Sequence, residues 1–518
     1  MQHAWIGTGL MLMLPIGYFL LAFLNEKVAR WRWAANFSLL GLALTLLMGL
    51  GAMLGWVGLD QPGHWFITSP TSLVMLGLVN FIALVNIRYS QRYMAGNRAE
   101  ERRYLSWLLV TLGSVCLVVV SNHMALFMLA WIAISVSLHR LLLFFPQRQR
   151  AVLAAHKKYI FARVAELCLL VAFGLLYFAH DTWLISEVYQ NVAQANALSS
   201  LDQWAAVLVA LAALVKCAQL PLHGWLIQVV EAPTPVSALL HAGIINLGGY
   251  LLIVFAPLIM LSGAAQWLLL VVGGLTTVLA ALVMMTRASV KVRLAWSTMS
   301  QMGLMLVECA LGLFELALLH LLAHSCYKAY AFLNSGSEVE ASMKRRLSRP
   351  VAPNRGDWWL AGGLAFVLVG GLVYGMGFDG PYSPWVLLGV ALMLLIAERR
   401  GRLSAASVTH VFGLAVVLVG AYTLQKNGVG LMVAPMTPVV GWPGDLWISF
   451  LFVMLLVGYI LMRYHADQPW MVKTRRAFYA GFYLDEWVTR FNLRVYPTRL
   501  PVRFKPKKLQ IPKEEWYR

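Results

Sequence analysis

Charged residues are scarce in this chain, and their scarcity excludes a soluble domain. Only 12% of the 518 residues are charged and 60% are hydrophobic, with a mean hydropathy of +0.70. Soluble domains carry roughly a quarter charged residues. The composition therefore predicts a membrane protein.

Cysteine is also scarce and does not cluster. The five cysteines are Cys116, Cys168, Cys217, Cys309 and Cys326, and they form neither a CxxC pair nor a group with histidine. This spacing argues against a disulfide framework and against a structural zinc site. We therefore expect this chain to carry no metal and no cofactor.

Acidic residues are outnumbered by basic ones, 22 to 41, which gives a net charge of +19. A nucleic-acid-binding protein gathers its basic residues on one face. Here they are spread over many short segments between apolar runs. Nucleic acid is therefore not an expected partner.

Long apolar runs, by contrast, are abundant, and each is long enough to cross a bilayer. The first, Leu10–Leu24, lacks the basic start and the small-residue cleavage site of a signal peptide, so we interpret it as a retained span. We predict an all-α polytopic membrane protein of about 15 transmembrane helices. The predicted spans are centred near residues 14, 46, 79, 112, 133, 168, 211, 246, 273, 301, 325, 367, 391, 415 and 455.

Basic residues alternate between the two sides of this arrangement. Nearly all of them follow odd-numbered spans, including Lys157 and Lys158, which we assign to the loop after the fifth span; Lys426 falls on the other side. By the positive-inside rule, the N-terminus is periplasmic and the C-terminus cytoplasmic in a bacterial inner membrane.

The chain divides into four predicted regions. N-terminal transmembrane helices occupy 1–100, a core occupies 101–400, and C-terminal transmembrane helices occupy 401–465. A cytoplasmic, basic and amphipathic tail occupies 466–518.

The seventh span contains a lysine next to a helix breaker. Lys216 lies five residues before Pro221, and proline removes a backbone hydrogen bond from a helix. We predict a broken helix near Lys216–Pro221, because such breaks mark ion sites in transporters. The alternative is a lysine that reaches the membrane surface beside an ordinary kink.

Three candidates follow this break. His223 comes directly after it, Glu231 precedes the prolines that begin the eighth span, and His241 lies about two turns further on. The alternative interpretation of Glu231 is an ordinary acid at a helix start. The alternative interpretation of His241 is an ordinary hydrogen-bonded core histidine. Their neighbours make them candidates for a proton pathway.

The eleventh span carries a stripe of titratable residues. His320, His324 and Lys328 lie at i, i+4 and i+8 and share one helix face. We interpret the stripe as a proton relay through bridging water. The alternative is a polar seam that joins packed helices.

The sixth span holds Arg163 and Glu166, which lie one turn apart and can pair. Glu166 is the only acid that we expect well inside a span. It either forms a simple salt bridge or switches between Arg163 and Lys216.

Four segments of this chain carry a family resemblance. AAHKKYIFARVAELCLL, VKCAQLPLHGWLIQVVEAPTPVSALLHA, SVKVRLAWSTMSQMGLM and HLLAHSCYKAYAFLNSGS resemble the antiporter-like proton-conducting subunits of respiratory complex I and Mrp antiporters. The resemblance covers roughly residues 100–340. It implies two inverted five-helix repeats, broken helices and a central polar axis.

The resemblance also implies roles for single residues. Lys216 matches the family's broken-helix lysine and His241 the histidine of the following helix, while Lys291 matches the lysine that opens the tenth helix. The remaining matches are the sixth-helix pair Arg163 and Glu166, and the eleventh-helix set His320, His324 and Lys328.

This chain departs from the family at three points. The fifth-helix Trp-Glu-Gly reads Trp131-Ile132-Ala133 here, so Glu166 is the substitute for the missing glutamate. The stretch Trp358–Gly380 has no lysine, although the family places a second broken-helix lysine there. The long lateral helix of complex I subunits also looks absent.

The tail points to one branch of the family. RAFYAGFYLDEWVTRFNLRVYPT resembles the C-terminus of the membrane subunit of the DAB-type inorganic-carbon transporter. That subunit pairs with a large cytoplasmic zinc-binding protein similar to β-carbonic anhydrases. The resemblance implies that this chain is not an enzyme, and that it couples a proton or Na⁺ gradient to CO2 hydration by its partner.

An interfacial helix followed by a basic arm suits the tail. We expect this helix to contact the partner, through residues Tyr483, Asp485, Glu486, Trp487 and Arg490. Membrane lipids are the alternative contact. Two other functions stay open for the chain: a subunit of a cation/proton antiporter or of a complex I-like or hydrogenase complex, and a scaffold that conducts nothing.

Overall fold

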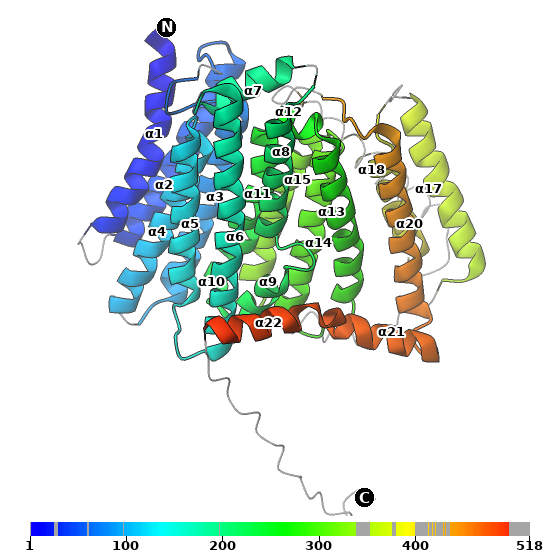
Figure 1. Cartoon of the computed structure of the whole chain (residues 1–518). Coiled ribbons are helices and arrows are strands. Elements are labelled where there is room, and N and C mark those ends of the chain that lie inside the picture. Colours follow the sequence, from blue (N-terminus) through cyan, green and yellow to red (C-terminus); the bar gives the residue numbers. More distant parts are fainter. Residues whose placement is uncertain are drawn as a thin grey trace, which may run out of the picture.

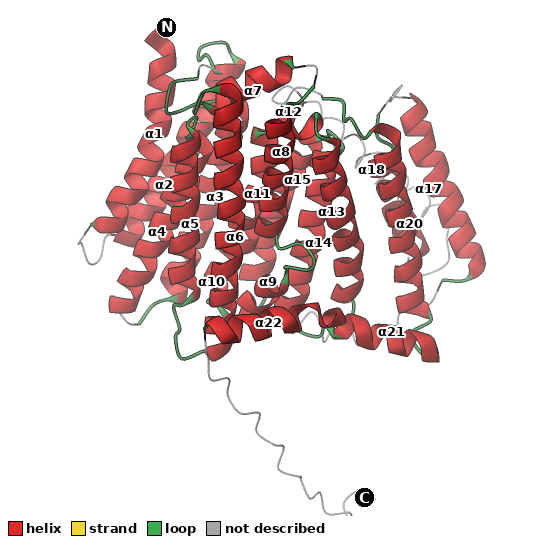
Figure 2. Ribbon diagram, in the orientation of Figure 1, coloured by secondary structure: helices red, strands yellow, loops and turns green. Residues whose placement is uncertain are grey.

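The computed structural model is helical throughout the residues that it describes, apart from two isolated β-bridges (Figure 2). The described residues are 2–24, 30–59, 62–96, 98–195, 197–337, 353–375, 380–398 and 436–496, with isolated positions between 413 and 430. The helices are α1 (Gln2–Phe23), α2 (Arg30–Met53), α3 (Pro70–Tyr93), α4 (Arg98–Val120), α5 (Met124–Leu142), α6 (Gln149–His180), α7 (Ile185–Gln194), α8 (Ser200–Lys216), α9 (Gly224–Gln228), η1 (Val229–Glu231), α10 (Thr234–Ala242), η2 (Ile244–Asn246), α11 (Leu247–Val254), α12 (Ala256–Met260), α13 (Gly263–Met284), α14 (Val290–Ala310), α15 (Phe314–Leu333), α17 (Arg355–Gly375), α18 (Ser383–Ala397), α20 (Gly441–Tyr464), α21 (Pro469–Tyr479), η3 (Gly481–Tyr483) and α22 (Leu484–Val495). The all-α prediction is confirmed.

The predicted spans agree with these helices. Every predicted centre falls within a described helix except the one near residue 415, which lies outside the described residues. Within the described part, ten helices are long and apolar enough to cross a membrane, and Gly9–Phe23 and Ser383–Ala397 are shorter apolar helices. The total of about 15 spans stays a prediction.

The bundle has two distinct ends (Figure 1). The end that carries the start of α1 and helix α7 is called the N-terminal face below. The opposite end is called the C-terminal face; α21 and α22 lie across it, roughly perpendicular to the long helices (Figure 1). The links between α5 and α6 and between α13 and α14, which hold basic residues, lie at this C-terminal face.

One continuous apolar core joins α1 through α15 with α20, while α17 and α18 pack on each other through small clusters of their own. Many large apolar side chains on the outside remain exposed, Phe178 and Phe366 among them. Backbone groups inside a bilayer must be paired within the protein, which helices achieve locally. The exposed apolar surface is therefore the side that faces lipid.

Two of the spans are broken. Helix α8 ends at Lys216, and the chain resumes as α9 only at Gly224, after Pro221. The predicted break near Lys216–Pro221 is therefore confirmed. The eighth span is interrupted as well, because the 3-10 turn η2 separates α10 from α11. No break was predicted at this position.

Glycine lets the two breaks approach each other closely. A Cβ atom on Gly248 in α11 would lie only 2.9 Å from the carbonyl oxygen of Ala213 in α8. A larger residue at position 248 would push α11 away from the end of α8. The glycine thus keeps Lys216 next to the interrupted eighth span.

Candidate functional site

Lys216 ends α8 inside the bundle, beside an aromatic ring. Its Nζ lies 4.3 Å from the centre of the Trp131 ring in α5, and Trp131 is fully buried. The face of an indole attracts an ammonium group. Ile132 stands where the family has glutamate, so an aromatic face rather than a carboxylate lies beside this lysine.

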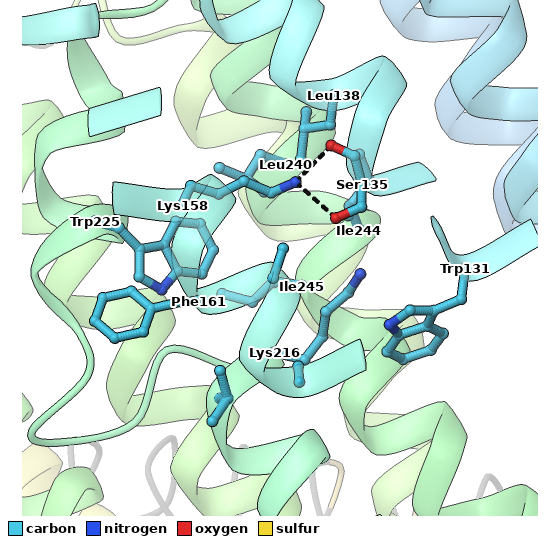
Figure 3. Close-up of a pocket in the computed structure, with 13 residues that line it drawn as sticks. Trp131, Ser135, Leu138, Lys158, Phe161, Lys216, Trp225, Leu240, Ile244 and Ile245 are labelled. Atoms are coloured by element: carbon cyan, nitrogen blue, oxygen red, sulfur yellow. Dashed lines mark hydrogen bonds between the residues drawn. The ribbon is translucent and has the colours of Figure 1, made fainter. Parts of the chain in front are cut away.

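A second buried lysine, Lys158 in α6, lies close to Lys216 (Figure 3). Its Nζ donates to the Ser135 carbonyl oxygen at 2.8 Å and to the Ser135 hydroxyl at 3.3 Å. The two lysines and Trp131 line a cavity of about 20 Å3. The cavity has room for about one water molecule, and its polar lining residues are Ser135 and the two lysines, with apolar side chains making up most of the wall.

Lys157 and Lys158 were predicted to lie in a loop, and this prediction is wrong. Helix α6 begins at Gln149 and therefore includes both residues. Basic residues before an apolar run are typical of a cytoplasmic loop, so no local pattern extended the predicted helix to these lysines. Lys158 is a site residue that sequence reasoning missed.

Arg163 and Glu166 pair with each other on α6, as one of the two interpretations proposed. An Nη2 atom of Arg163 lies 2.8 Å from the Glu166 carboxylate. Glu166 is buried, and its charge acts on both Lys158 and Lys216. The switch of Glu166 from Arg163 to Lys216 stays a prediction.

His241 lies fully buried in α10. Its Nδ1 lies 3.1 Å from the Thr298 hydroxyl of α14, and its ring stacks on Phe332 of α15 with 4.3 Å between centroids. Its Nε2 has no protein partner. His241 thus connects three helices and keeps one nitrogen for exchange.

The stripe on α15 points into the bundle. Lys328 donates to the Ser297 hydroxyl at 2.8 Å. His324 is buried, neither of its ring nitrogens has a protein partner, and its ring lies 6.2 Å from that of His320. A single water molecule could bridge the two rings across this distance.

Glu308 in α14 corrects the expectation that Glu166 is the only acid well inside a span. Its carboxylate contacts His320 Nδ1 at 3.0 Å, and the side chains of the pair are only 8% and 12% exposed. The residue lies near the end of an apolar run, so it resembled a surface acid in the sequence. An acid three to four turns from any other charge on its own helix was the available signal.

Eight residues form what we call the polar path. Lys158, Glu166 and Lys216 come from α6 and α8, His241 belongs to the interrupted eighth span, and Lys328, His324, His320 and Glu308 come from α15 and α14. The path runs from the lower half of the bundle on α6 and α8 towards the N-terminal face on α14 and α15 (Figure 1).

Three predicted candidates lie nearer the C-terminal face. His223 Nδ1 lies 3.2 Å from the Pro221 carbonyl oxygen, and Lys291 donates to the Thr234 hydroxyl at 2.8 Å. The backbone carbonyl of Glu231 accepts from Arg148 at 3.2 Å. Their proposed part in a proton pathway stays a prediction.

The predicted partner-binding residues divide into two groups. Asp485 faces the bundle and accepts from Lys157 at 2.7 Å and from Gln228 at 2.8 Å. Tyr483 and Trp487 are exposed, and Glu486 and Arg490 form an exposed pair with 3.6 Å between Oε2 and Nη2. Asp485 therefore holds α22 against the bundle, and the other four are open to a partner or to lipid.

Within the described residues, no group of three or more histidine, cysteine or carboxylate side chains could hold a metal ion. The basic arm after residue 496 lies outside the described residues.

Known proteins match this chain over its whole length. The family described as NADH:quinone oxidoreductase/Mrp antiporter, TM, matches residues 121–352. A Hydrogenovibrio crunogenus protein named probable inorganic carbon transporter subunit DabB is 68% identical over 517 residues, which cover 100% of both chains. The chain belongs to the DabB family. DabB2 of Halothiobacillus neapolitanus is 35% identical over 91% of this chain and 89% of its own length.

The chain is also similar to a quinone oxidoreductase subunit and to a chain of an Mrp complex. NADH-quinone oxidoreductase subunit L of Mycobacterium tuberculosis is 31% identical over 64% of this chain and 56% of its own length. A chain in the structure of the Mrp complex from Dietzia sp. DQ12-45-1b matches with a TM-score of 0.56 and 21% identity, over 95% of this chain and 57% of that one. The resemblance to antiporter-like subunits and the polytopic membrane fold are confirmed.

Proposed function

We propose that this chain conducts protons along the polar path and uses their flow to drive inorganic carbon accumulation by a zinc-containing partner. The observation that carries the proposal is the path itself. Eight titratable side chains, six of them buried, lie on α6, α8, α10, α14 and α15 of a membrane bundle in a chain of the DabB family. Buried ionisable groups are costly in a membrane protein and mark proton or ion routes.

Protons suit this path better than Na⁺. Its groups are mainly lysine and histidine, which carry protons, whereas hard cations prefer oxygen ligands. Glu166 and Glu308 supply carboxylates, but Arg163 and His320 already engage them. A Na⁺ ion would have to displace these two partners.

The orientation that we propose for the chain in the membrane is based on its basic residues. We assign the C-terminal face to the cytoplasm and the N-terminal face to the periplasm of a bacterial inner membrane, because basic links lie at the C-terminal face. On this assignment, protons enter near Glu308 and reach the cytoplasmic half near Lys216 and Lys158.

The partner that we propose is a large cytoplasmic protein similar to β-carbonic anhydrases, which would supply the zinc chemistry. Helix α22 supports this, because it presents Tyr483, Trp487 and Phe491 at the C-terminal face although the rest of the helix docks on the bundle. Exposed aromatic residues with a neighbouring arginine are typical of protein interfaces. Lipid headgroups are the competing contact.

A second function has specific support. Residues 121–352 match the transmembrane family of NADH:quinone oxidoreductase and Mrp antiporters. The chain could therefore serve a cation/proton antiporter or a complex I-like complex. Lysine is absent from the described part of the stretch where that family places its second broken-helix lysine. This difference favours the carbon-transport proposal.

Co-purification distinguishes the two functions. We expect the affinity-tagged chain, extracted from its native membrane, to carry one large zinc-containing subunit, identified by mass spectrometry and metal analysis. A variant with Tyr483, Trp487 and Phe491 changed to serine should lose that subunit and remain in the membrane. Recovery of several membrane subunits of a quinone-reducing or Mrp-type complex would contradict the proposal.

A further inference from the structure

The Glu308–His320 pair at the end of the polar path adjoins a large cavity in the described part of the bundle. The cavity, about 390 Å3 in volume, lies between α14, α18 and α20, and Leu304, Leu388 and Phe452 are among its lining residues. Glu308 is the one charged residue on its wall. The cavity therefore touches the polar path at Glu308.

The cavity lies at the N-terminal face. Its lining includes Leu311 and Leu313, which belong to the short link between α14 and α15. It also includes Ser383 at the first turn of α18, whose hydroxyl is buried and has no protein partner. These residues lie at the end of the bundle that carries α7 (Figure 1).

The Glu308 carboxylate has hydrogen-bonding capacity that the protein does not fill. An ionised carboxylate has about four acceptor positions, and both oxygens of Glu308 contact the same atom, His320 Nδ1. Glu308 lines the cavity, whose wall is otherwise apolar except for Ser383, so a water molecule in the cavity would bind at these two side chains. A buried carboxylate with so few partners draws water to itself.

His320 is arranged to take up a proton. Its Nδ1 faces the Glu308 carboxylate, and its Nε2 lies 2.9 Å from the Gln301 side-chain oxygen. Two acceptors suit an imidazolium, which donates from both nitrogens. When the ring is neutral, a rotation of the Gln301 amide presents its NH2 group to the bare nitrogen instead. The same three side chains therefore accommodate both protonation states.

The route continues inward from this pair. The His324 ring lies 6.2 Å from the His320 ring, and neither of its nitrogens has a protein partner. A water molecule between the rings would pass a proton from one to the other. His324 is followed by Lys328 one turn further along α15.

We propose that Glu308, His320 and Gln301 form the outer proton-exchange site of this chain, and that the cavity between α14, α18 and α20 connects the site to the periplasm. Glu308 collects a proton from cavity water and passes it to His320 Nδ1; the imidazolium then releases its Nε2 proton, once Gln301 gives up its contact, through a bridging water molecule to His324. This inference rests on the proposed function, because it assigns the end of the path and not the conduction itself.

The first test compares carboxylate variants in proteoliposomes that contain the chain with its co-purified partner. We expect Glu308→Gln to lower the rate of proton uptake about a hundredfold, the lower end of what a positioned proton donor contributes. Glutamine keeps the size and the acceptor oxygen that His320 needs, so folding is preserved. Glu308→Asp should restore part of the rate. The matched control is Glu187→Gln, which removes an exposed carboxylate at the same face and should change nothing.

The second test determines the side of access. Glu308→Cys is made in a chain whose five native cysteines are replaced, and vesicles are treated with carboxyethyl methanethiosulfonate, which does not cross membranes and adds a carboxylate to a thiol. Reagent on the periplasmic side should restore proton uptake. Restoration only from the cytoplasmic side would overturn the inference.

Measuring Lys216→Met in the same vesicles separates this inference from the proposed function. If Lys216→Met loses proton uptake while Glu308→Gln keeps the full rate, the polar path stands and its outer end is not Glu308. If the unchanged chain itself transports no protons, the proposed function and the outer site both fail. If both variants lose uptake and external reagent rescues Glu308→Cys, the inference is supported.

Discussion

Replacing Lys216 by methionine should abolish proton uptake and inorganic carbon accumulation while leaving the protein folded. Methionine fills the same volume and has no proton to carry, so the rate should fall by about a hundredfold or more. Exchanging a buried charge for an apolar group of similar size is often neutral or stabilising. The membrane content of the variant should therefore match that of the wild type.

Lys216→Arg tests whether the lysine carries protons or only supplies a charge. Arginine keeps the contact with the Trp131 ring and remains charged in proteins. A proton carrier should fail in this variant too, whereas a purely structural cation should function. The measurements are uptake of labelled inorganic carbon by cells and proton uptake by vesicles, with Lys473→Met on the exposed surface of α21 as the control. Full activity of Lys216→Arg would refute the proton-carrier role.

Replacing Asp485 by alanine should detach helix α22 from the bundle. Lys157 is 0% exposed and Asp485 26% exposed in their 2.7 Å ion pair. Removing one member of a buried pair costs about 3–5 kcal/mol, because the other charge loses its partner. The Lys157 ammonium keeps only the Thr489 hydroxyl, and that residue belongs to α22 as well. Water can reach Lys157 only if α22 moves away.

Trypsin cleavage after Arg490 measures this detachment, because a helical site must unfold locally before it is cut. At about 1.4 kcal/mol per tenfold change, the cleavage rate of Asp485→Ala should rise about a hundredfold or more. Combining Lys157→Met with Asp485→Leu replaces the pair by apolar groups and should restore slow cleavage. Glu486→Ala breaks only an exposed pair and should change stability by less than about 1 kcal/mol. Equal cleavage of all four proteins would show that the pair does not hold α22.

Helix α22 also covers the broken span, so its detachment has a second expected consequence. A Cβ atom on Gly224, the first residue of α9, would overlap the Asp485 carboxylate, which shows how closely the two elements pack. Between a partner bound to the exposed side of α22 and the break after Lys216 there would thus be only the contact of Asp485 with Gly224. Coupling between partner and path should weaken in Asp485→Ala even where proton conduction survives.

Sequence reasoning located the spans because each span is a local property. About 20 apolar residues must form a helix in a bilayer, whatever surrounds them. The break after Lys216 was equally local, since Pro221 interrupts any helix. His320, His324 and Lys328 share a face by helical periodicity alone, and the structure places all three in the bundle interior or against it.

Errors arose where helix length or burial depended on neighbours. Lys157 and Lys158 belong to α6 because Asp485 and Ser135, from distant segments, receive their ammonium groups. Glu308 lies inside the bundle because the ring of His320 on the next helix contacts its carboxylate. The interruption at η2 has no proline at its centre, and the local signal for it, Gly243 between α10 and η2, is weaker than a proline.

The amino-acid sequence by itself determined the class of the protein, the positions of its spans and the shared face of the α15 residues, because composition and periodicity act over a few turns of one helix. Only the tertiary structure decided which groups meet. Trp131 reaches Lys216, Glu308 reaches His320, and Asp485 reaches Lys157 across 328 positions of the chain. Such pairs depend on how helices pack in three dimensions, and side-chain packing between distant segments leaves no periodic trace along the chain.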